Sequence, residues 1–196
     1  IRMMGTIIDL MVEHDSPDAI LAEATKRLRI YEQRFSANDP KSELMQLNQL
    51  AGKAPLVVHP DLFHLIKLGK SHSLAPGSQL NIAIGPLVQS WRIGFADAKV
   101  PSAQDIQQLL QITDPNKILL SEKDQTVFLQ QAGMAIDLGA VAKGYIADLL
   151  TAYFKEAGVA SALINLGGNV VVFGTSRNHE DSYWRIGIQN PLLPRA

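Results

Sequence analysis

The chain has 196 residues, a formal net charge of −1 and no cysteine. A chain of this length can bury a sizeable core as one domain. The near-neutral charge argues against a nucleic-acid-binding surface, which needs clustered lysine and arginine. The absence of cysteine excludes disulfides, thiolate metal ligands and a cysteine nucleophile. No apolar run approaches the roughly 20 residues of a membrane-spanning helix.

The N-terminal third predicts one strand and then helices. Residues 4–13 are mostly apolar and predict the strand. Ser16, Pro17 and Asp18 predict a helix start, because they supply a cap, a proline at the first helical position and an acidic residue in the first turn. Apolar residues then recur every three or four positions as far as Phe35, which predicts one buried helix face. Ser42 is expected to cap a short second helix that ends at Leu50.

The middle of the chain predicts a short strand at residues 56–58 and three more helices. A helix is expected at residues 61–73, and another from Pro86 to Trp91. The third follows Ser102, because Asp105 three residues later completes a capping box. Residues 79–85 mix polar, apolar and glycine residues and precede Pro86.

The C-terminal part predicts strands around one long helix. Residues 117–121 and 125–131 predict a hairpin, and residues 140–157 predict the longest helix, which Gly158 ends. Three strands are expected at residues 161–166, 169–174 and 184–189. These elements together favour an α+β fold with antiparallel sheet.

The most informative motif runs from Asp137 to Asp148. A short apolar stretch passes through Gly139 into a helix, so a carboxylate, a free helix N-terminus and Lys143 lie within two turns of each other. Such an arrangement suits a phosphate group, with a metal ion as a second possible ligand. The alternatives are a solvated surface lysine at Lys143 and a capping carboxylate at Asp137. A second apolar strand ends in Gly167 and Gly168, where backbone can approach a ligand closely.

Other candidate sites are weaker. Ser36 and Ser42 have no histidine and aspartate partners nearby in the sequence, so a hydrolase triad has no support. The five histidines show no paired metal-binding spacing and are interpreted as surface or capping residues; they are His14, His59, His64, His72 and His179.

These motifs resemble, in order along the chain, those of the ApbE family of FAD:protein FMN transferases. The matching segments are residues 4–6, 35–36, 42–44, 47–48, 81–88 with Trp91, 137–148 and 167–169. The resemblance implies a duplicated sheet-and-helix unit, similar to a T-fold, that binds FAD in a cleft between its halves. On this basis residues 1–196 are expected to form a single flavin-binding domain.

The resemblance also implies site residues. The positions that match cofactor-binding residues of the family are Met4, Asn38, Gln79, Leu80, Asn81, Asp137 and Lys143. The position of Ala140 is a metal ligand in the family, and an alanine can ligate Mg²⁺ only through its backbone carbonyl. Two positions depart from the family pattern, because Asn81 stands where aspartate is common and Asn38 where many members have tyrosine. Met4 could equally be a strand core residue, and Asn81 could be a turn residue.

The family pattern continues past Ala196, where it places a catalytic histidine and the remaining Mg²⁺ ligands. The catalytic residue is therefore unknown, and the chain is expected to be a fragment with weakened FAD binding and no FMN transfer of its own. The implied reaction moves FMN from FAD to a threonine hydroxyl of an acceptor flavoprotein and releases AMP. An FAD pyrophosphatase and a non-catalytic FAD-binding module remain alternatives.

The resemblance leaves two properties open. Family members occur both as extracytoplasmic lipid-anchored proteins and in the cytoplasm, so no compartment is assigned. Exposed apolar surface, if the fragment lacks its partner half, predicts self-association.

Overall fold

A computed structural model describes residues 1–176 and 179–193 of the chain. These residues form two compact units, the first made of residues 1–24 and 149–196 and the second of residues 25–148. Helices α1 (Pro17–Phe35) and α6 (Ala142–Glu156) contribute residues to both units. The expectation of a single domain stays a prediction, and each unit is described by itself.

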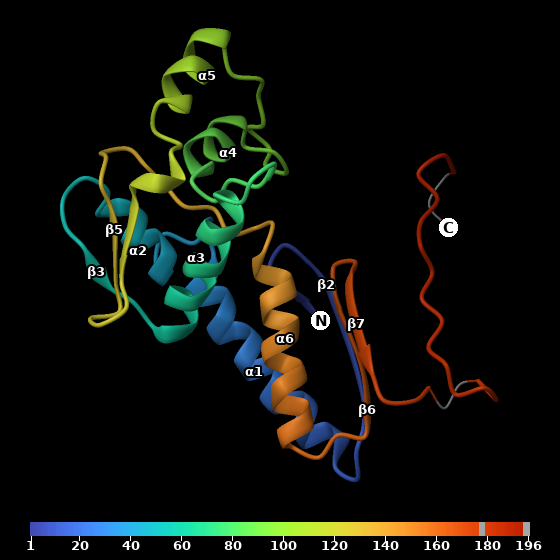
Figure 1. Cartoon of the computed structure of the whole chain (residues 1–196). Helices are drawn as coiled ribbons and strands as arrows, with labels where there is room; N and C mark the ends of the chain where they lie inside the picture. The colour runs from blue at the N-terminus through green and yellow to red at the C-terminus, as the bar shows by residue number, and fades with distance from the viewer. Residues whose placement is uncertain (177–178, 194–196) are drawn as a thin grey trace. The chain divides into compact units, whose positions relative to one another are not determined.

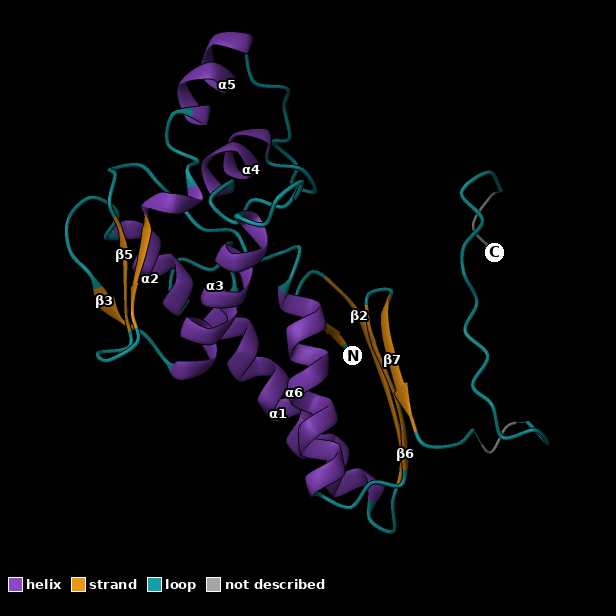
Figure 2. Ribbon diagram, viewed as in Figure 1, coloured by secondary structure: helices purple, strands orange, loops and turns teal. Residues whose placement is uncertain are grey.

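The first unit is built on a four-stranded antiparallel sheet with the strand order β1-β2-β6-β7. Its strands are β1 (Arg2–Met3), β2 (Thr6–Glu13), β6 (Ser161–Leu166) and β7 (Asn169–Phe173), drawn as arrows in Figures 1 and 2. One face of the sheet is buried, because Ile8, Ile164 and Leu166 are at most 1% exposed. Buried residues of the two helices complete this core; they are Ala24, Leu150 and Phe154.

The second unit contains a smaller antiparallel sheet with the order β3-β5-β4. Its strands are β3 (Leu56–Val57), β5 (Thr126–Leu129) and β4 (Ile118–Ser121). The helices of this unit are α2 (Glu43–Gln49), α3 (Pro60–Ser73), α4 (Gly85–Trp91) and α5 (Ala103–Leu110), with a short 3₁₀ turn at Pro115–Lys117. The expected α+β class with antiparallel sheets is confirmed.

Side-chain caps start three helices of the second unit. The Ser42 hydroxyl accepts a hydrogen bond from the Met45 amide at 3.0 Å, and Ser102 and Asp105 form the predicted capping box. The His59 ring caps α3 by accepting from the Asp61 amide at 3.1 Å. The interpretation of His59 as a capping residue is therefore confirmed.

Two predicted element starts are two residues too early, and one predicted strand is wrong. Strand β2 begins at Thr6, because Met4 and Gly5 form a tight turn with φ of 54° and 69°, as a two-residue hairpin requires. Helix α6 begins at Ala142, two residues later than expected. Residues 184–189 are not a strand, because no neighbouring strand in the described residues pairs with them.

Candidate functional site

Two segments of the second unit that are far apart in the sequence lie side by side. The Asp137 amide donates to the Ile82 carbonyl at 2.9 Å, and Ile84 forms a parallel bridge with Ala135. Gly85 permits this approach, because a Cβ there would lie 2.6 Å from the Ala135 carbonyl oxygen. The structure therefore brings Ile82, which directly follows the predicted stretch at residues 79–81, next to Asp137.

Polar side chains from two helices fix the main chain of these segments. The Ser73 hydroxyl of α3 accepts from the Ile82 amide at 3.0 Å and donates to the Gly69 carbonyl at 2.7 Å. Asn48 of α2 makes two hydrogen bonds to the main chain of Ile136. Asn48 lies in the family-matching segment at residues 47–48, but neither residue was assigned a role from the sequence. An asparagine within a short apolar helix was the available signal, because asparagine is a weak helix former that often bonds to backbone.

The Asn81 side-chain amide makes two hydrogen bonds within the protein. Its Nδ2 donates to the Thr113 carbonyl at 2.8 Å, and its Oδ1 accepts from the Ala83 amide at 2.8 Å. The bond from the Ala83 amide to Oδ1 joins residues two positions apart, as in an Asx turn. The interpretation of Asn81 as a turn residue is therefore confirmed. A cofactor contact through this side chain would use the second Nδ2 hydrogen or the second lone pair of Oδ1. Gln79 is exposed and Leu80 is half-buried.

The start of α6 is open to solvent. The Leu138 carbonyl accepts from the amides of Val141 and Ala142 at 3.0 and 2.8 Å, and one Asp137 carboxylate oxygen accepts from the Gly139 amide at 2.7 Å. Ala140 is exposed.

Four groups at this helix start have no partner among the described residues. The Ala140 carbonyl accepts no hydrogen bond there, and the Lys143 ammonium group has neither a hydrogen bond nor an ion pair there. The first-turn amides of Lys143 and Gly144 also lack a carbonyl partner, as expected at a helix N-terminus. Unpaired amides, the positive end of the helix dipole and a free ammonium group favour an anion such as phosphate.

The remaining predicted contacts are placed differently. Asn38 is exposed, and its amide donates to the Ser36 hydroxyl at 3.1 Å, so it lies in a turn after α1. Met4 belongs to the first unit, where its turn lies beside the turn of Gly167 and Gly168. The Gly167 amide donates to the Ile7 carbonyl at 3.1 Å, and a Cβ on Gly167 would clash with the Thr6 hydroxyl. The other predicted residues belong to the second unit, so a site shared with Met4 stays a prediction.

A row of aromatic rings borders the first turn of α6. The rings of Tyr31 and Phe35 stack at 5.9 Å, Tyr145 contacts Phe35 edge-on at 6.1 Å, and His64 stacks on Tyr145 at 5.7 Å. Burial, followed by the nearby Asp61 carboxylate, raises the pKa of Tyr31 and the pKa of Tyr145. Both phenols therefore remain neutral over the physiological pH range.

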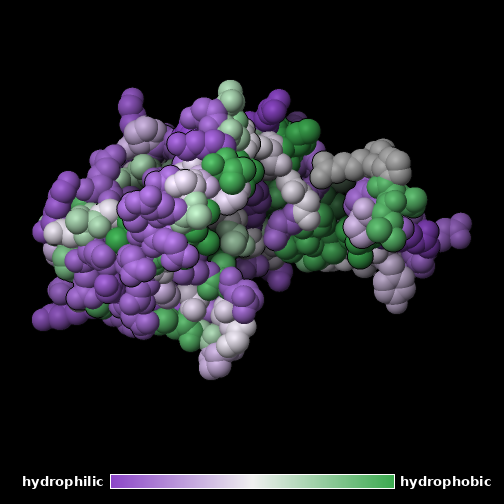
Figure 3. Space-filling view, turned by 90° about the horizontal axis from the view of Figure 1, so that it is seen from above, coloured by the Kyte–Doolittle hydropathy of each residue, from purple (hydrophilic) through white to green (hydrophobic). Residues whose placement is uncertain are grey.

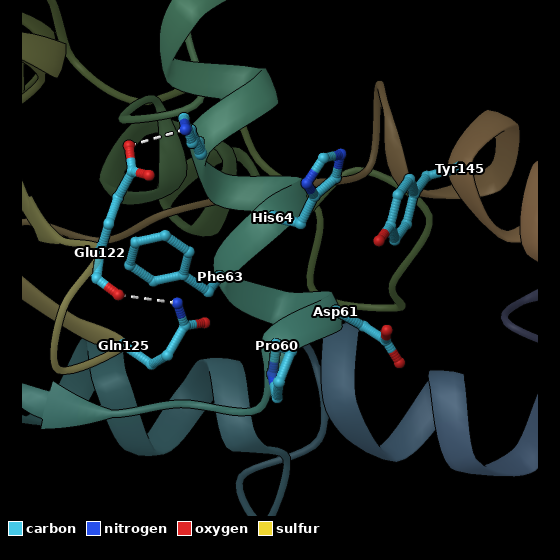
Figure 4. A pocket seen from close by; sticks show the side chains of 8 residues that line it. Pro60, Asp61, Phe63, His64, Glu122, Gln125 and Tyr145 are labelled. Carbon is cyan, nitrogen blue, oxygen red and sulfur yellow. Dashed lines mark hydrogen bonds and ion pairs between the residues drawn. The ribbon is translucent and has the colours of Figure 1, made fainter.

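A shallow pocket of about 390 Å³ lies beside this row in the second unit (Figure 4). Its lining residues are Pro60, Asp61, Phe63, His64, Lys67, Glu122, Gln125 and Tyr145. Lys67 pairs with Glu122 at 2.7 Å across it. None of the predicted site residues lines this pocket, whereas Tyr145 from the first turn of α6 does.

The described residues contain no cluster of three or more histidine, aspartate or glutamate side chains that could hold a metal ion. No helix among these residues is both long enough and apolar enough to cross a membrane. The catalytic histidine expected beyond Ala196 lies outside the described residues.

Comparison with known proteins identifies relatives along almost the whole chain. The model of the ApbE family matches residues 4–196. A protein from Klebsiella pneumoniae (strain 342) named FAD:protein FMN transferase is 42% identical over 97% of this chain and 57% of its own length. A protein of the same name from Treponema pallidum (strain Nichols) is 33% identical over 96% of this chain and 56% of its own length.

Solved structures show the same fold. The flavin transferase ApbE from Vibrio cholerae superimposes with a TM-score of 0.85 at 22% identity, over 97% of this chain and 62% of that chain. An ApbE protein from Thermotoga maritima gives a TM-score of 0.85 at 23% identity, over 96% and 61% of the two chains. The chain thus spans a little over half the length of the curated relatives it matches.

Proposed function

Because the chain belongs to the ApbE family, we propose that it serves the transfer of FMN from FAD to an acceptor flavoprotein. In this reaction a threonine hydroxyl oxygen of the acceptor attacks the phosphorus of the FMN half, the bond to the AMP phosphate breaks, and the hydroxyl proton passes to a base. AMP is the leaving group. The relatives from Klebsiella and Treponema, which carry the name of this activity, support the proposal.

The observation that carries the proposal is the open start of α6. Lys143 and the free first-turn amides offer positive charge and donors without any competing protein partner in the described residues. A pyrophosphate seated there would gain charge-assisted hydrogen bonds, and charge that develops on the leaving AMP phosphate would be offset. Asp137, whose carboxylate accepts from the Gly139 amide, and the stretch at residues 79–81, which leads into Ile82, would contact the rest of the nucleotide.

The residues present also fit a magnesium ion in part. Mg²⁺ prefers oxygen ligands and is commonly held by one or two carboxylates together with substrate phosphates. We propose the exposed Ala140 carbonyl as one ligand, since it accepts no hydrogen bond from the described residues, with Asp137 close by in sequence. A bound Mg²⁺ would neutralise charge on the phosphate oxygens.

The test measures binding and products separately. Isothermal titration with FAD, ADP and riboflavin, each with and without Mg²⁺, should show that FAD and ADP bind more tightly than riboflavin, because only they carry the pyrophosphate. Equal affinity for FAD and riboflavin would remove the phosphate argument.

Products distinguish the three activities. FAD, Mg²⁺ and a peptide of the Asp-Gly-x-Thr-Gly-Ala type are incubated with the protein and analysed by mass spectrometry and chromatography. A peptide carrying covalent FMN together with free AMP supports transfer to threonine. Free FMN and AMP without the adduct support a pyrophosphatase, and intact FAD supports a binding module.

A further inference from the structure

The Asn48 side chain on α2 makes two hydrogen bonds to the main chain of Ile136, and we call this pair of bonds the clamp. Its Oδ1 accepts from the Ile136 amide at 2.8 Å, and its Nδ2 donates to the Ile136 carbonyl at 3.0 Å. The amide thus pairs with both polar backbone groups of one residue, as a neighbouring strand would. The two residues are 88 positions apart, so this clamp connects α2 to the segment that carries Asp137.

The next residue is held from another segment. The Asp137 amide donates a hydrogen bond to the Ile82 carbonyl at 2.9 Å. The Ile82 amide in turn donates a hydrogen bond to the Ser73 hydroxyl at 3.0 Å, which fixes Ile82. The side chains of Ile136 and Leu138, on either side of Asp137, are completely buried. Main-chain bonds and buried neighbours therefore leave the Asp137 backbone little freedom.

The Asp137 carboxylate accepts a hydrogen bond from the Gly139 amide, so this amide can be used to follow its position. Its Oδ1 accepts from the Gly139 amide at 2.7 Å, and a Cβ on Gly139 would lie 3.0 Å from the same oxygen. The carboxylate is thus held over the turn that leads into α6. A shift in the main chain at Ile136 would move it relative to Lys143.

We propose that Asn48 is a positioning residue, which holds Asp137 in place for the nucleotide by clamping Ile136. This inference rests on the proposed function. Binding groups must be held to within a fraction of an ångström by their supporting hydrogen bonds. Loss of the clamp is therefore expected to weaken FAD binding although Asn48 itself does not touch the ligand.

The variants separate the clamp from general stability. Asn48→Ala removes both hydrogen bonds to Ile136, together with a weak one to the Met45 sulfur, and suits a helix. Asn48→Asp keeps the shape and the acceptor but sets a carboxylate oxygen against the Ile136 carbonyl. Val127→Ala is the control, because it opens a cavity at a fully buried residue of β5 that makes no hydrogen bond to the Ile136 segment. The two Asn48 variants give independent readings should one of them fail to fold.

The first readout needs no ligand. The amide resonance of Gly139 reports its hydrogen bond to Asp137. We expect this resonance to move toward its value in unstructured peptides in Asn48→Ala and Asn48→Asp, and to stay in place in Val127→Ala. An unchanged Gly139 resonance in a folded Asn48 variant would overturn the proposal.

The second readout is a double-mutant cycle on FAD affinity. Asn48→Ala and Asp137→Ala should each weaken FAD binding, the first by about ten-fold, and Asn48→Ala should have little further effect once Asp137 is replaced. Additive losses in the double variant would overturn the proposal and leave the proposed function intact. No effect of Asp137→Ala would instead count against the proposed site, while the Gly139 resonance would still decide the role of Asn48.

Discussion

At the residue scale, Lys143 is the side chain on which the phosphate argument depends. It stands one residue into α6, beside free amides, and has no partner in the described part of the chain. A charge-assisted contact from an ammonium group to a phosphate contributes on the order of 1–3 kcal/mol. The sequence motif predicted this lysine, whereas its lack of any protein partner became visible only in the structure.

Lys143→Ala is expected to weaken binding of FAD and ADP by roughly 5- to 150-fold, which is the same range expressed as affinity. Riboflavin has no phosphate, so its affinity should hardly change. The difference between parent and variant should shrink as salt rises, because the contact is partly exposed. Titration calorimetry at low and high salt measures each effect. Equal FAD affinity of Lys143→Ala and the parent chain at low salt would show that Lys143 is a solvated surface residue that does not contact the ligand.

Ser42 shows how one buried hydroxyl supports two elements. It is fully buried, its hydroxyl donates to the Ser36 carbonyl at 2.6 Å, and it accepts from the Met45 amide at 3.0 Å. Ser42→Ala should lower the free energy of unfolding by about 1–3 kcal/mol, since it removes a helix cap and the donor to the carbonyl of half-buried Ser36. Urea unfolding measures this loss. Ser102→Ala, at the exposed cap of α5, is the control. It should lower the free energy of unfolding by less, because water can solvate the former partners of the Ser102 hydroxyl.

At the element scale, caps and turns were the features that the sequence predicted best. Ser42, Ser102 and the proline that opens α1 mark helix starts through local hydrogen bonding or backbone geometry, so they need no knowledge of the rest of the fold. The predicted strand at residues 184–189 failed because a strand depends on a partner, and periodicity alone cannot supply one. The pairing of residues 82–84 with 135–137 was likewise invisible, because it connects distant and short segments.

The aromatic row between α1, α3 and α6 predicts how stability depends on pH. Burial raises the pKa of Tyr145 above its ordinary value near 10.0, so the unfolded chain loses this phenolic proton at lower pH than the folded chain does. Between those two pKa values the folded state binds more protons, and stability therefore falls as pH rises. Below the ordinary pKa this contribution is fully present.

Tyr145→Phe tests this dependence, because it removes the ionisable group and keeps the ring stacked on His64. Urea midpoints measured between about pH 8 and about pH 11 should decline less steeply in Tyr145→Phe than in the parent chain. Tyr183→Phe is the control, since this side chain is 73% exposed and outside the row. A decline of equal slope in all three proteins would contradict the prediction.

At the scale of the whole molecule, hydrophilic side chains cover much of the face seen in Figure 3, with smaller hydrophobic areas between them.

The sheet of the first unit has one buried face and one face that the described helices leave open. On the open face Ile7 is 63% and Met11 50% exposed, and Met11 pairs in register with Leu163, which pairs with Val172. Strand β7 forms an edge of this sheet in the described residues, so its outer backbone groups are also free to pair.

This open face predicts self-association of the chain, with a second copy as the partner. This face carries exposed apolar side chains beside the Asp9–Asn165 pair and ends at the outer edge of β7. It can extend across two copies, which would bury Met11 and Ile7 and pair the free edge of β7. Sedimentation velocity over a range of concentrations should show a dimer that forms as concentration rises. Met11→Lys places a charge at the centre of the face and should shift the equilibrium toward monomer, whereas Ile93→Lys, at an isolated side chain of the second unit that is 78% exposed, should not. A parent chain that stays monomeric at high concentration, or an equal effect of the two substitutions, would show that the open face does not drive association.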